Sequence, residues 1–321
     1  MTLTEKIVAV VGSTGVQGGS VVRTLLNDGT FAVRALTRDV NKAQDLKDLG
    51  AEVVAADAED VESLKKAFRG AWGVFGVTDC KRNSFAQFLE AQPVSLCIVW
   101  TLLPIHGGNQ AETQAHEEQY GRNLVDAAEA EGVQHFVTLP HIEAYTVYHF
   151  ASKVTVENYL RSKKVPFSVI LTSAYYSNLT RYGLLRREGD GFIVALGLPS
   201  TSKVPSFDAH EIGSWVLVAL KSEPTGKTYN ACGEILTPLE YAEALSRVSG
   251  KTVKVQEVTP TAFRSKEHIQ KLGNELWLNM KSIYEGLFIQ DLKKSREENP
   301  NAKTFEEFAK TDPELKECLG Y

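Results

Sequence analysis

The sequence predicts an α/β fold: a Rossmann-type doubly wound parallel sheet with a smaller mixed α/β C-terminal lobe. Short apolar runs alternate with amphipathic stretches through the first half of the chain, and a glycine-rich turn stands directly behind the first run. From about residue 175 the rhythm changes, and glycines punctuate a less regular stretch. We therefore expect a first domain over 1–175 and a smaller lobe over 176–321 that is interleaved with it.

The apolar runs place the strands of the first domain, and the periodic stretches place its helices. Strands of a parallel sheet are buried on both faces, so they are continuous apolar runs such as Ile7 to Val11. The strands are expected to end near residues 11, 37, 56, 78, 138 and 171. The helices are expected to cover roughly 18–27, 40–49, 60–69, 112–131 and 151–163.

The second half has its own boundary residues. A helix is expected over 208–220, and strands over 227–232 and 253–258. Two capping boxes, Thr237 with Glu240 and Thr304 with Glu307, mark the starts of two further helices. The first of these helices should end at Gly250.

The turn behind the first strand, Gly12-Ser13-Thr14-Gly15-Val16-Gln17-Gly18, has the composition of a phosphate-binding loop. Its first glycine allows a tight turn, the second lets the backbone approach phosphates, and the third lets the helix pack closely on the strand. The helix that follows has free N–H groups and the positive end of its dipole at the turn. The spacing is GxxGxxG, and a plain strand-to-helix turn is the alternative. We expect the turn to provide a dinucleotide site with Gly12, Thr14, Gly15, Val16, Gln17 and Gly18.

Charged residues behind the second strand favour NADP(H) over NAD(H). An NAD site usually carries Asp or Glu about 20 residues past the glycines, whereas this chain has Arg38 there and Lys42 one helical turn later. A guanidinium can bind a 2′-phosphate through two hydrogen bonds. Asp39 is the counter-argument, because it could accept a hydrogen bond from a ribose hydroxyl. Ordinary surface charges are the plain alternative.

The ends of the next two strands should face the same crevice, because ligands of open parallel sheets bind beyond the carboxyl ends of the strands. Asp57 and Ala58 follow the third strand, and Val77 and Thr78 follow the fourth. Asp57 could reach the adenine amine, or it could simply begin the next loop. We include these four residues among the cofactor contacts.

Composition and charge exclude several classes of protein. The 321 residues carry a net charge of −5 with no basic run, so direct nucleic-acid binding is not expected. The four cysteines are scattered, which argues against a disulfide framework or a metal site and fits a reducing compartment. No apolar stretch reaches the about 20 residues that span a bilayer, and the first strand begins too close to Met1 for a signal peptide. We expect a cytoplasmic protein, with the nucleus as a second compartment.

Residues 80–111 do not follow the alternating pattern. They contain an apolar run from Val94 to Ile105 that is rich in β-branched residues, followed by His106-Gly107-Gly108. This stretch could be an inserted strand, a lid over the crevice, or the surface that binds a partner. It could also be sequence that does not belong to the fold.

The pattern resembles the NmrA-like family, an atypical branch of the short-chain dehydrogenase/reductase superfamily. The likeness covers roughly 1–79 and 112–260, and it is carried by the glycine turn, Thr37-Arg38 with Lys42, Gly50 to Val54 with Asp57, Gly121 to Ala128, and His149 to Lys153 with Val156 to Leu160. The resemblance implies a Rossmann domain that binds NADP(H). Family members include redox sensors that regulate transcription factors or signalling proteins, and also true reductases. Tyr175 and Asn178 match the family's segment beside the nicotinamide.

His149 and Lys153 decide between a sensor and an enzyme. Active short-chain dehydrogenases carry Tyr-x-x-x-Lys, and the four-residue spacing puts both side chains on one helix face. The lysine lowers the tyrosine pKa and binds the nicotinamide ribose, and the tyrosine transfers the proton. Here His149 takes the place of the tyrosine, so ribose binding by Lys153 is expected while the usual proton donor is missing. Thr138, at the end of the fifth strand, is the nearest counterpart of the catalytic serine.

Two functions remain open from the sequence. A histidine can act as a general acid near neutral pH, but a nearby ammonium group would lower the pKa of His149 and leave it mostly neutral. His149 could equally be a packed or capping residue, and Lys153 a solvated charge. We favour an NADP(H)-binding redox sensor with a regulatory protein partner; the alternative is an NADPH-dependent oxidoreductase of a small carbonyl, quinone or enone. A monomer or homodimer without a metal is expected.

Overall fold

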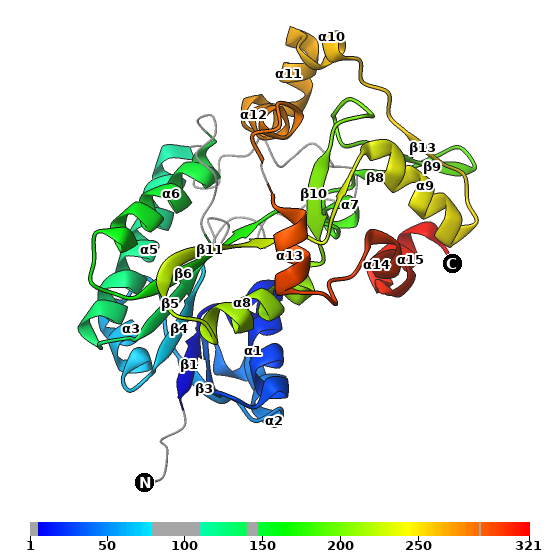
Figure 1. Cartoon of the computed structure of the whole chain (residues 1–321). Coiled ribbons are helices and arrows are strands. Elements are labelled where there is room, and N and C mark those ends of the chain that lie inside the picture. Colours follow the sequence, from blue (N-terminus) through cyan, green and yellow to red (C-terminus); the bar gives the residue numbers. More distant parts are fainter. Residues whose placement is uncertain (1–5, 79–109, 140–146, 289) are drawn as a thin grey trace.

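A computed structural model describes residues 6–78, 110–139, 147–288 and 290–321 (Figure 1). Its centre is a seven-stranded sheet with the order β11-β6-β5-β4-β1-β2-β3, and every pairing in it is parallel. The strand order reverses beside β1, which is the switch point of a doubly wound fold. The predicted fold class is therefore confirmed. The strands are β1 (Ile7–Val10), β2 (Ala32–Thr37), β3 (Glu52–Ala55), β4 (Gly73–Gly76), β5 (His135–Thr138), β6 (Phe167–Thr172) and β11 (Thr225–Ala231).

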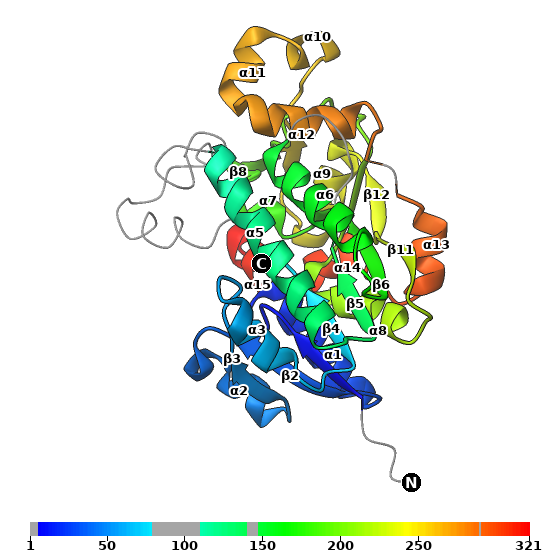
Figure 2. The same ribbon diagram turned by 90° about the vertical axis from the view of Figure 1, so that its left-hand side faces the viewer.

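Both faces of the sheet are covered, as Figures 1 and 2 show. Val8 and Val10 of β1 pack into the core on one face, and Ala9 and Val11 into the core on the other. Helices α1 (Val16–Asp28) and α8 (Ile212–Leu220) pack together on the first face. The second face carries α3 (Val61–Phe68), α5 (Gln110–Ala130) and α6 (Tyr148–Arg161). A short turn η1 (Val40–Ala43) and α2 (Gln44–Asp48) connect β2 to β3.

The smaller lobe has two three-stranded sheets, with the orders β12-β10-β7 and β13-β9-β8. Their strands are β7 (Ala174–Tyr175), β8 (Leu185–Glu188), β9 (Gly191–Val194), β10 (Val204–Phe207), β12 (Glu234–Leu236) and β13 (Val253–Val255). The helices of the lobe are α7 (Asn178–Arg181), α9 (Pro238–Ser249), α10 (Pro260–Phe263), α11 (Lys266–Leu272), α12 (Asn274–Tyr284), α14 (Phe305–Thr311) and α15 (Pro313–Leu319). A separate buried cluster that includes Tyr241, Phe263 and Phe305 forms its core.

The chain passes between the two parts more than once. After β10, the short turn η2 (Ala209–Glu211) leads into α8 and β11 of the central fold. The chain then enters the lobe again, and α13 (Leu292–Glu298) returns to pack on β11 (Figure 1). Both predicted capping boxes are present, at the starts of α9 and α14, and Gly250 ends α9 in a left-handed conformation.

Three expectations about the second half need correction. The stretch after residue 175 is not irregular, since β8, β9 and β10 lie in it; glycines there form the turns between short strands. The strand expected over 253–258 ends at Val255. The sequence pattern also does not predict the helices from α10 to α13: three of the four have seven residues or fewer, and most residues of the four are exposed or half-buried.

Two properties bear on the class of protein. Within the four described ranges, no helix combines the length and the apolar character that crossing a membrane requires. The described residues also contain no group of three or more His, Cys, Asp or Glu side chains arranged to hold a metal ion.

Candidate functional site

The glycine turn lies at the carboxyl end of β1, at the switch point of the sheet. Gly12 has a φ of 66°, in the left-handed region that favours glycine. Gly15 is the N-cap of α1, and no side chain caps the helix. Because the first N–H groups of a helix lack partners within it, this end of α1 can offer them to an anion together with the positive end of the dipole.

The turn is packed as tightly as its glycines allow. A Cβ atom on Gly18 would lie 2.2 Å from the carbonyl oxygen of Gly12, and a Cβ on Gly15 would lie 3.3 Å from the same oxygen. The helix can therefore approach the strand only with glycine at position 18. The remaining predicted residues of the turn differ in exposure: Thr14 is exposed, and Val16 and Gln17 are half-buried.

The end of β2 presents two cations. The side chains of Arg38 and Lys42 are exposed and form no hydrogen bond or ion pair with the described residues. The carboxylate of Asp39, the acid that would argue for NAD, caps η1 by accepting a hydrogen bond from the Asn41 N–H at 3.0 Å. The local structure thus engages the acid and leaves the two cations available to a ligand.

The ends of β3 and β4 border the same edge of the sheet. The Asp57 carboxylate accepts a hydrogen bond from the Glu59 N–H at 3.1 Å, so it shapes the turn after β3. The carbonyl oxygen of Ala58 accepts one from the Asn123 amide of α5 at 2.8 Å. Val77 follows β4 and lies against the turn, with its Cγ1 3.3 Å from where a Cβ on Gly12 would be.

Lys153 meets a buried carboxylate that sequence reasoning missed. Glu117 of α5 is 1% exposed, and it accepts hydrogen bonds from the Lys153 ammonium, from the Thr78 hydroxyl at 2.8 Å and from the Ser152 hydroxyl at 2.5 Å. Burial by itself would raise the pKa of Glu117, but the Lys153 charge and these hydrogen bonds outweigh it and hold the pKa below its ordinary value. Glu117 therefore carries a negative charge against the Lys153 ammonium.

A signal for Glu117 is present in the sequence. The buried residues of α5 recur at helical spacing, with Tyr120, Leu124 and Ala128 on the covered side. Glu117 and Thr113 continue that stripe towards the start of the helix. A glutamate in the buried phase of an amphipathic helix is unusual, and it points to a partner from another element.

The catalytic residues expected from the sequence are placed only in part. The backbone of His149 is in the first turn of α6, but its side chain lies outside the described part of the chain. Thr138 is the last residue of β5 and is buried. The atypical stretch 80–111 also falls outside the described residues, except for Gln110 and Ala111, which begin α5.

Tyr175 brings the smaller lobe into contact with the glycine turn. Its hydroxyl accepts a hydrogen bond from the side-chain amide of Gln17, and its ring packs edge-on against Phe207 with 5.3 Å between the ring centroids. Asn178, three residues later, begins α7 and is half-buried. The segment that carries Tyr175 thus lies against the glycine turn, and Asn178 follows it in the chain.

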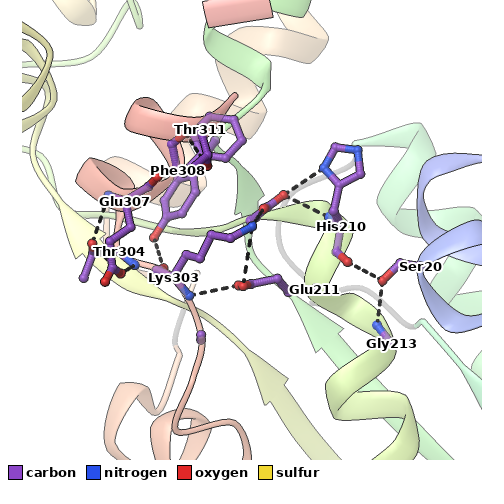
Figure 3. A network of polar contacts seen from close by, with 12 residues as sticks. Ser20, His210, Glu211, Gly213, Lys303, Thr304, Glu307, Phe308 and Thr311 are labelled. Carbon is purple, nitrogen blue, oxygen red and sulfur yellow. Dashed lines mark hydrogen bonds and ion pairs between the residues drawn. The ribbon is translucent and has the colours of Figure 1, made fainter. Parts of the chain in front are cut away.

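A polar network that sequence reasoning did not predict connects the segment before α14 with α1, the helix that follows the glycine turn (Figure 3). The Lys303 ammonium lies 2.8 Å from the buried Asp208 carboxylate, and the Lys303 N–H donates to Glu211 at 3.0 Å. On the other side, the Ser20 hydroxyl of α1 donates to the His210 carbonyl oxygen at 2.5 Å. The network therefore connects the loop before α14 with α1 through η2.

The fold and these features together define a Rossmann-type α/β protein with a glycine turn at its switch point. Residues 4–309 match the NmrA-like family, and the chain belongs to that family. The family resemblance drawn from the sequence is thereby confirmed.

Proteins similar to this chain are described as having different functions. The NmrA-like family domain-containing oxidoreductase ptmS of Penicillium ochrochloron is 29% identical to this chain over an alignment 317 residues long. The alignment covers 88% of this chain and 84% of ptmS. NmrA, described as a negative transcriptional regulator, has been solved with NADP and with NAD; both structures have a TM-score of 0.74 at 21% identity, and they cover 99% of this chain and at least 98% of NmrA. The Citrobacter sp. triphenylmethane reductase in complex with NADP(H) has a TM-score of 0.69 at 21% identity, with 98% of this chain and 99% of the reductase covered. At these identities the structural likeness establishes the fold.

Proposed function

We propose that this protein binds NADP(H) across the glycine turn and acts as a redox sensor that regulates a protein partner. The observation that carries the binding is the N-terminus of α1 at the switch point, which no side chain of the described residues caps. The side chains of Arg38 and Lys42, at the end of the neighbouring strand, are exposed and have no hydrogen bond or ion pair among those residues. The helix end suits the pyrophosphate. The two cations suit a 2′-phosphate, so NADP(H) is preferred over NAD(H).

The sensor function is supported by the state of Lys153. In a short-chain dehydrogenase, an uncompensated lysine charge lowers the pKa of the acid beside it. Here the buried Glu117 carboxylate is in direct contact with the Lys153 ammonium and offsets its charge. The sequence also has His149 where the tyrosine would be. Cofactor binding and partner regulation, with the protein as a monomer or homodimer, fit this site better than turnover does.

An NADPH-dependent reduction of a small carbonyl, quinone or enone is the second candidate. It is supported by ptmS, which is described as an oxidoreductase, and by the triphenylmethane reductase that shares the fold. Tyr175 adds a phenolic hydroxyl beside the glycine turn, where it accepts a hydrogen bond from Gln17. A hydroxyl there could supply a proton in place of the missing tyrosine.

The first experiment is a titration of the purified protein with NADPH, NADP, NADH and NAD, followed by absorbance at the reduced-nicotinamide band with a panel of quinones, aldehydes and enones. Tight NADP(H) binding without consumption supports the sensor, and a partner should then bind differently to the oxidised and reduced complexes. Consumption of NADPH that Lys153→Ala abolishes would identify a reductase instead. Absence of binding to all four nucleotides would overturn both functions.

A further inference from the structure

Glu117 connects three elements of the fold. Its carboxylate contacts Thr78 after β4 and both Ser152 and Lys153 of α6, while Glu117 itself belongs to α5. The Lys153 ammonium also donates to the Thr78 carbonyl oxygen at 3.4 Å. A single buried anion thus fixes the relative positions of a hydroxyl, an ammonium group and the chain that leaves β4.

This arrangement depends on the charge of Glu117. A buried carboxylate is costly unless it is paired and hydrogen-bonded. The ammonium and two hydroxyls supply that compensation, and they hold the pKa of Glu117 below its ordinary range although burial opposes this. Removal of the negative charge would take the Glu117 carboxylate's charge away from the Lys153 ammonium, whose side chain is only 21% exposed.

The strand order places this cluster relative to a bound dinucleotide. A dinucleotide bound as in other doubly wound folds would have its pyrophosphate at the glycine turn after β1 and its adenosine on the side of β2, where Arg38 lies. β4 flanks β1 on its opposite edge, so Thr78 and its neighbours lie on the side of the nicotinamide half. Lys153 and Thr78 would therefore be on the side of the nicotinamide ribose of such a ligand, and Arg38 on the side of its adenosine.

We propose that Glu117 is a positioning residue for the nicotinamide half of the cofactor: it holds Lys153 and Thr78 in place and does not touch the cofactor itself. The inference rests on the proposed dinucleotide binding. It predicts that loss of the Glu117 charge weakens contacts made by the nicotinamide half and leaves those of the adenosine half unchanged.

The test is calorimetric titration of the wild type and Glu117→Gln with two ligands, NADPH and adenosine 2′,5′-bisphosphate. The second ligand contains the adenosine and its 2′-phosphate but lacks the nicotinamide ribose. Glu117→Gln keeps the size of the side chain and should weaken NADPH binding about tenfold, the effect of losing one charge-assisted contact. Its affinity for the bisphosphate should stay within about twofold, because contacts more than 7–10 Å away respond independently.

A double-mutant cycle with Lys153→Met tests whether Glu117 acts through the lysine. If it does, Glu117→Gln weakens NADPH binding in the wild type but has little further effect in Lys153→Met. Glu118→Gln is the matched control: Glu118 is the next residue of α5, its carboxylate bonds the Gln114 amide, and its substitution should not change either affinity.

Stability is separated from positioning by two further variants. If Glu117→Gln fails to fold because the Lys153 ammonium loses the compensating Glu117 charge, the double variant Glu117→Gln with Lys153→Met removes both charges and should fold. Ser152→Ala deletes one hydrogen bond to Glu117 and should give a smaller loss of NADPH affinity in the same direction.

Three results would overturn the proposed role of Glu117. They are an equal loss of affinity for NADPH and the bisphosphate in Glu117→Gln, no loss of affinity for either ligand, and additive effects of the two substitutions in the double-mutant cycle. A wild type that binds the bisphosphate but not NADPH would overturn it as well, whereas a wild type that binds neither would refute the proposed function and this role together.

Discussion

The carbonyl oxygen of Gly12 occupies the space in which a side chain at Gly18 would begin. A Cβ on Gly18 would lie 2.2 Å from that oxygen and 2.6 Å from its carbon, both of them backbone atoms that cannot move aside cheaply. This contact sets how closely α1 approaches the end of β1. Gly15 and Gly18 therefore differ in how well they tolerate a side chain. The Cβ of an alanine at Gly15 would be 3.3 Å from the same oxygen, and the φ of Gly15 has an ordinary value of −86°.

Gly18→Ala should therefore cost both stability and cofactor binding. Overpacking of this kind typically costs about 1–3 kcal/mol, and the shift of α1 would displace the N–H groups from the phosphates. Gly15→Ala is the comparison: its Cβ would lie 3.3 Å from the Gly12 carbonyl oxygen, a tight contact that needs only a small shift. It should therefore cost less stability than Gly18→Ala, and it should weaken NADPH binding by crowding the approach to the turn. Urea unfolding and NADPH titration of both variants separate the two effects. Equal stability of the two variants would contradict this assignment.

The sequence is sufficient to predict the strands of the central sheet, but not the side-chain contacts between the helices that pack on it. The strands from β1 to β6 follow from apolar runs, and the ends of α9 follow from Thr237 and Gly250, because these are local properties of the chain. Glu117 lies 36 residues before Lys153, and their contact arises from the packing of α5 on α6. The sequence offers only the helical phase of Glu117 as a hint, and that phase does not name the partner.

Lys303 should stabilise the protein more than other surface lysines do. Its ammonium lies 2.8 Å from Asp208, whose side chain is 3% exposed, whereas Lys310 pairs with the exposed Glu306 at 2.9 Å. Lys303→Met keeps the aliphatic part of the side chain but leaves Asp208 with only its His210 contacts. Because Lys303 is 39% exposed and partly screened, we expect a loss of about 1–2 kcal/mol in the free energy of unfolding.

Lys310→Met is the matched control for Lys303, since it removes an exposed ion pair and should cost less than about 0.5 kcal/mol. Urea unfolding of both variants gives the comparison. If Lys310→Met lowers the free energy of unfolding as much as Lys303→Met does, the network in Figure 3 stabilises the protein no more than an exposed ion pair.

His135 should make the protein sensitive to mild acid. It is fully buried at the start of β5, its Nε2 contacts the Ser168 hydroxyl at 2.9 Å, and burial, with a smaller contribution from Lys6, lowers its pKa from 6.5 to about 4. In the unfolded chain the histidine binds its proton at higher pH than in the folded one. Stability from the neutral His135 is thus present above about pH 6.5 and is lost as the pH falls to about 4, by up to about 3 kcal/mol at about 1.4 kcal/mol per pKa unit.

The variant His135→Gln cannot gain this proton, so its stability should change less between pH 6.5 and 4, even if it is lower at neutral pH. His116→Gln, at an exposed position of α5, is the control for the exchange of histidine for glutamine itself. Urea midpoints at intervals across this range measure both profiles. A His135→Gln profile as steep as that of the wild type would assign the acid sensitivity to other groups.

Arg38 should set the preference for NADP(H) over NAD(H). Its guanidinium follows β2, is exposed and has no partner among the described residues, whereas the neighbouring Asp39 caps η1. Arg38→Ala should weaken NADPH binding by about 10- to 100-fold, the range expected for loss of a charge-assisted pair, and leave NADH binding nearly unchanged. Lys42→Ala should act in the same direction but less strongly, because an ammonium group binds phosphate as a point charge.

Lys66→Ala is the control for both variants. Lys66 is an exposed cation of α3, on the opposite face of the sheet, and its substitution should alter neither the NADPH affinity nor the NADH affinity. The effects of Arg38 and Lys42 should shrink at high salt, since both groups are exposed to screening. Equal loss of NADPH and NADH affinity in Arg38→Ala would instead mean that the residue supports the turn, and the preference would have to arise elsewhere in the crevice.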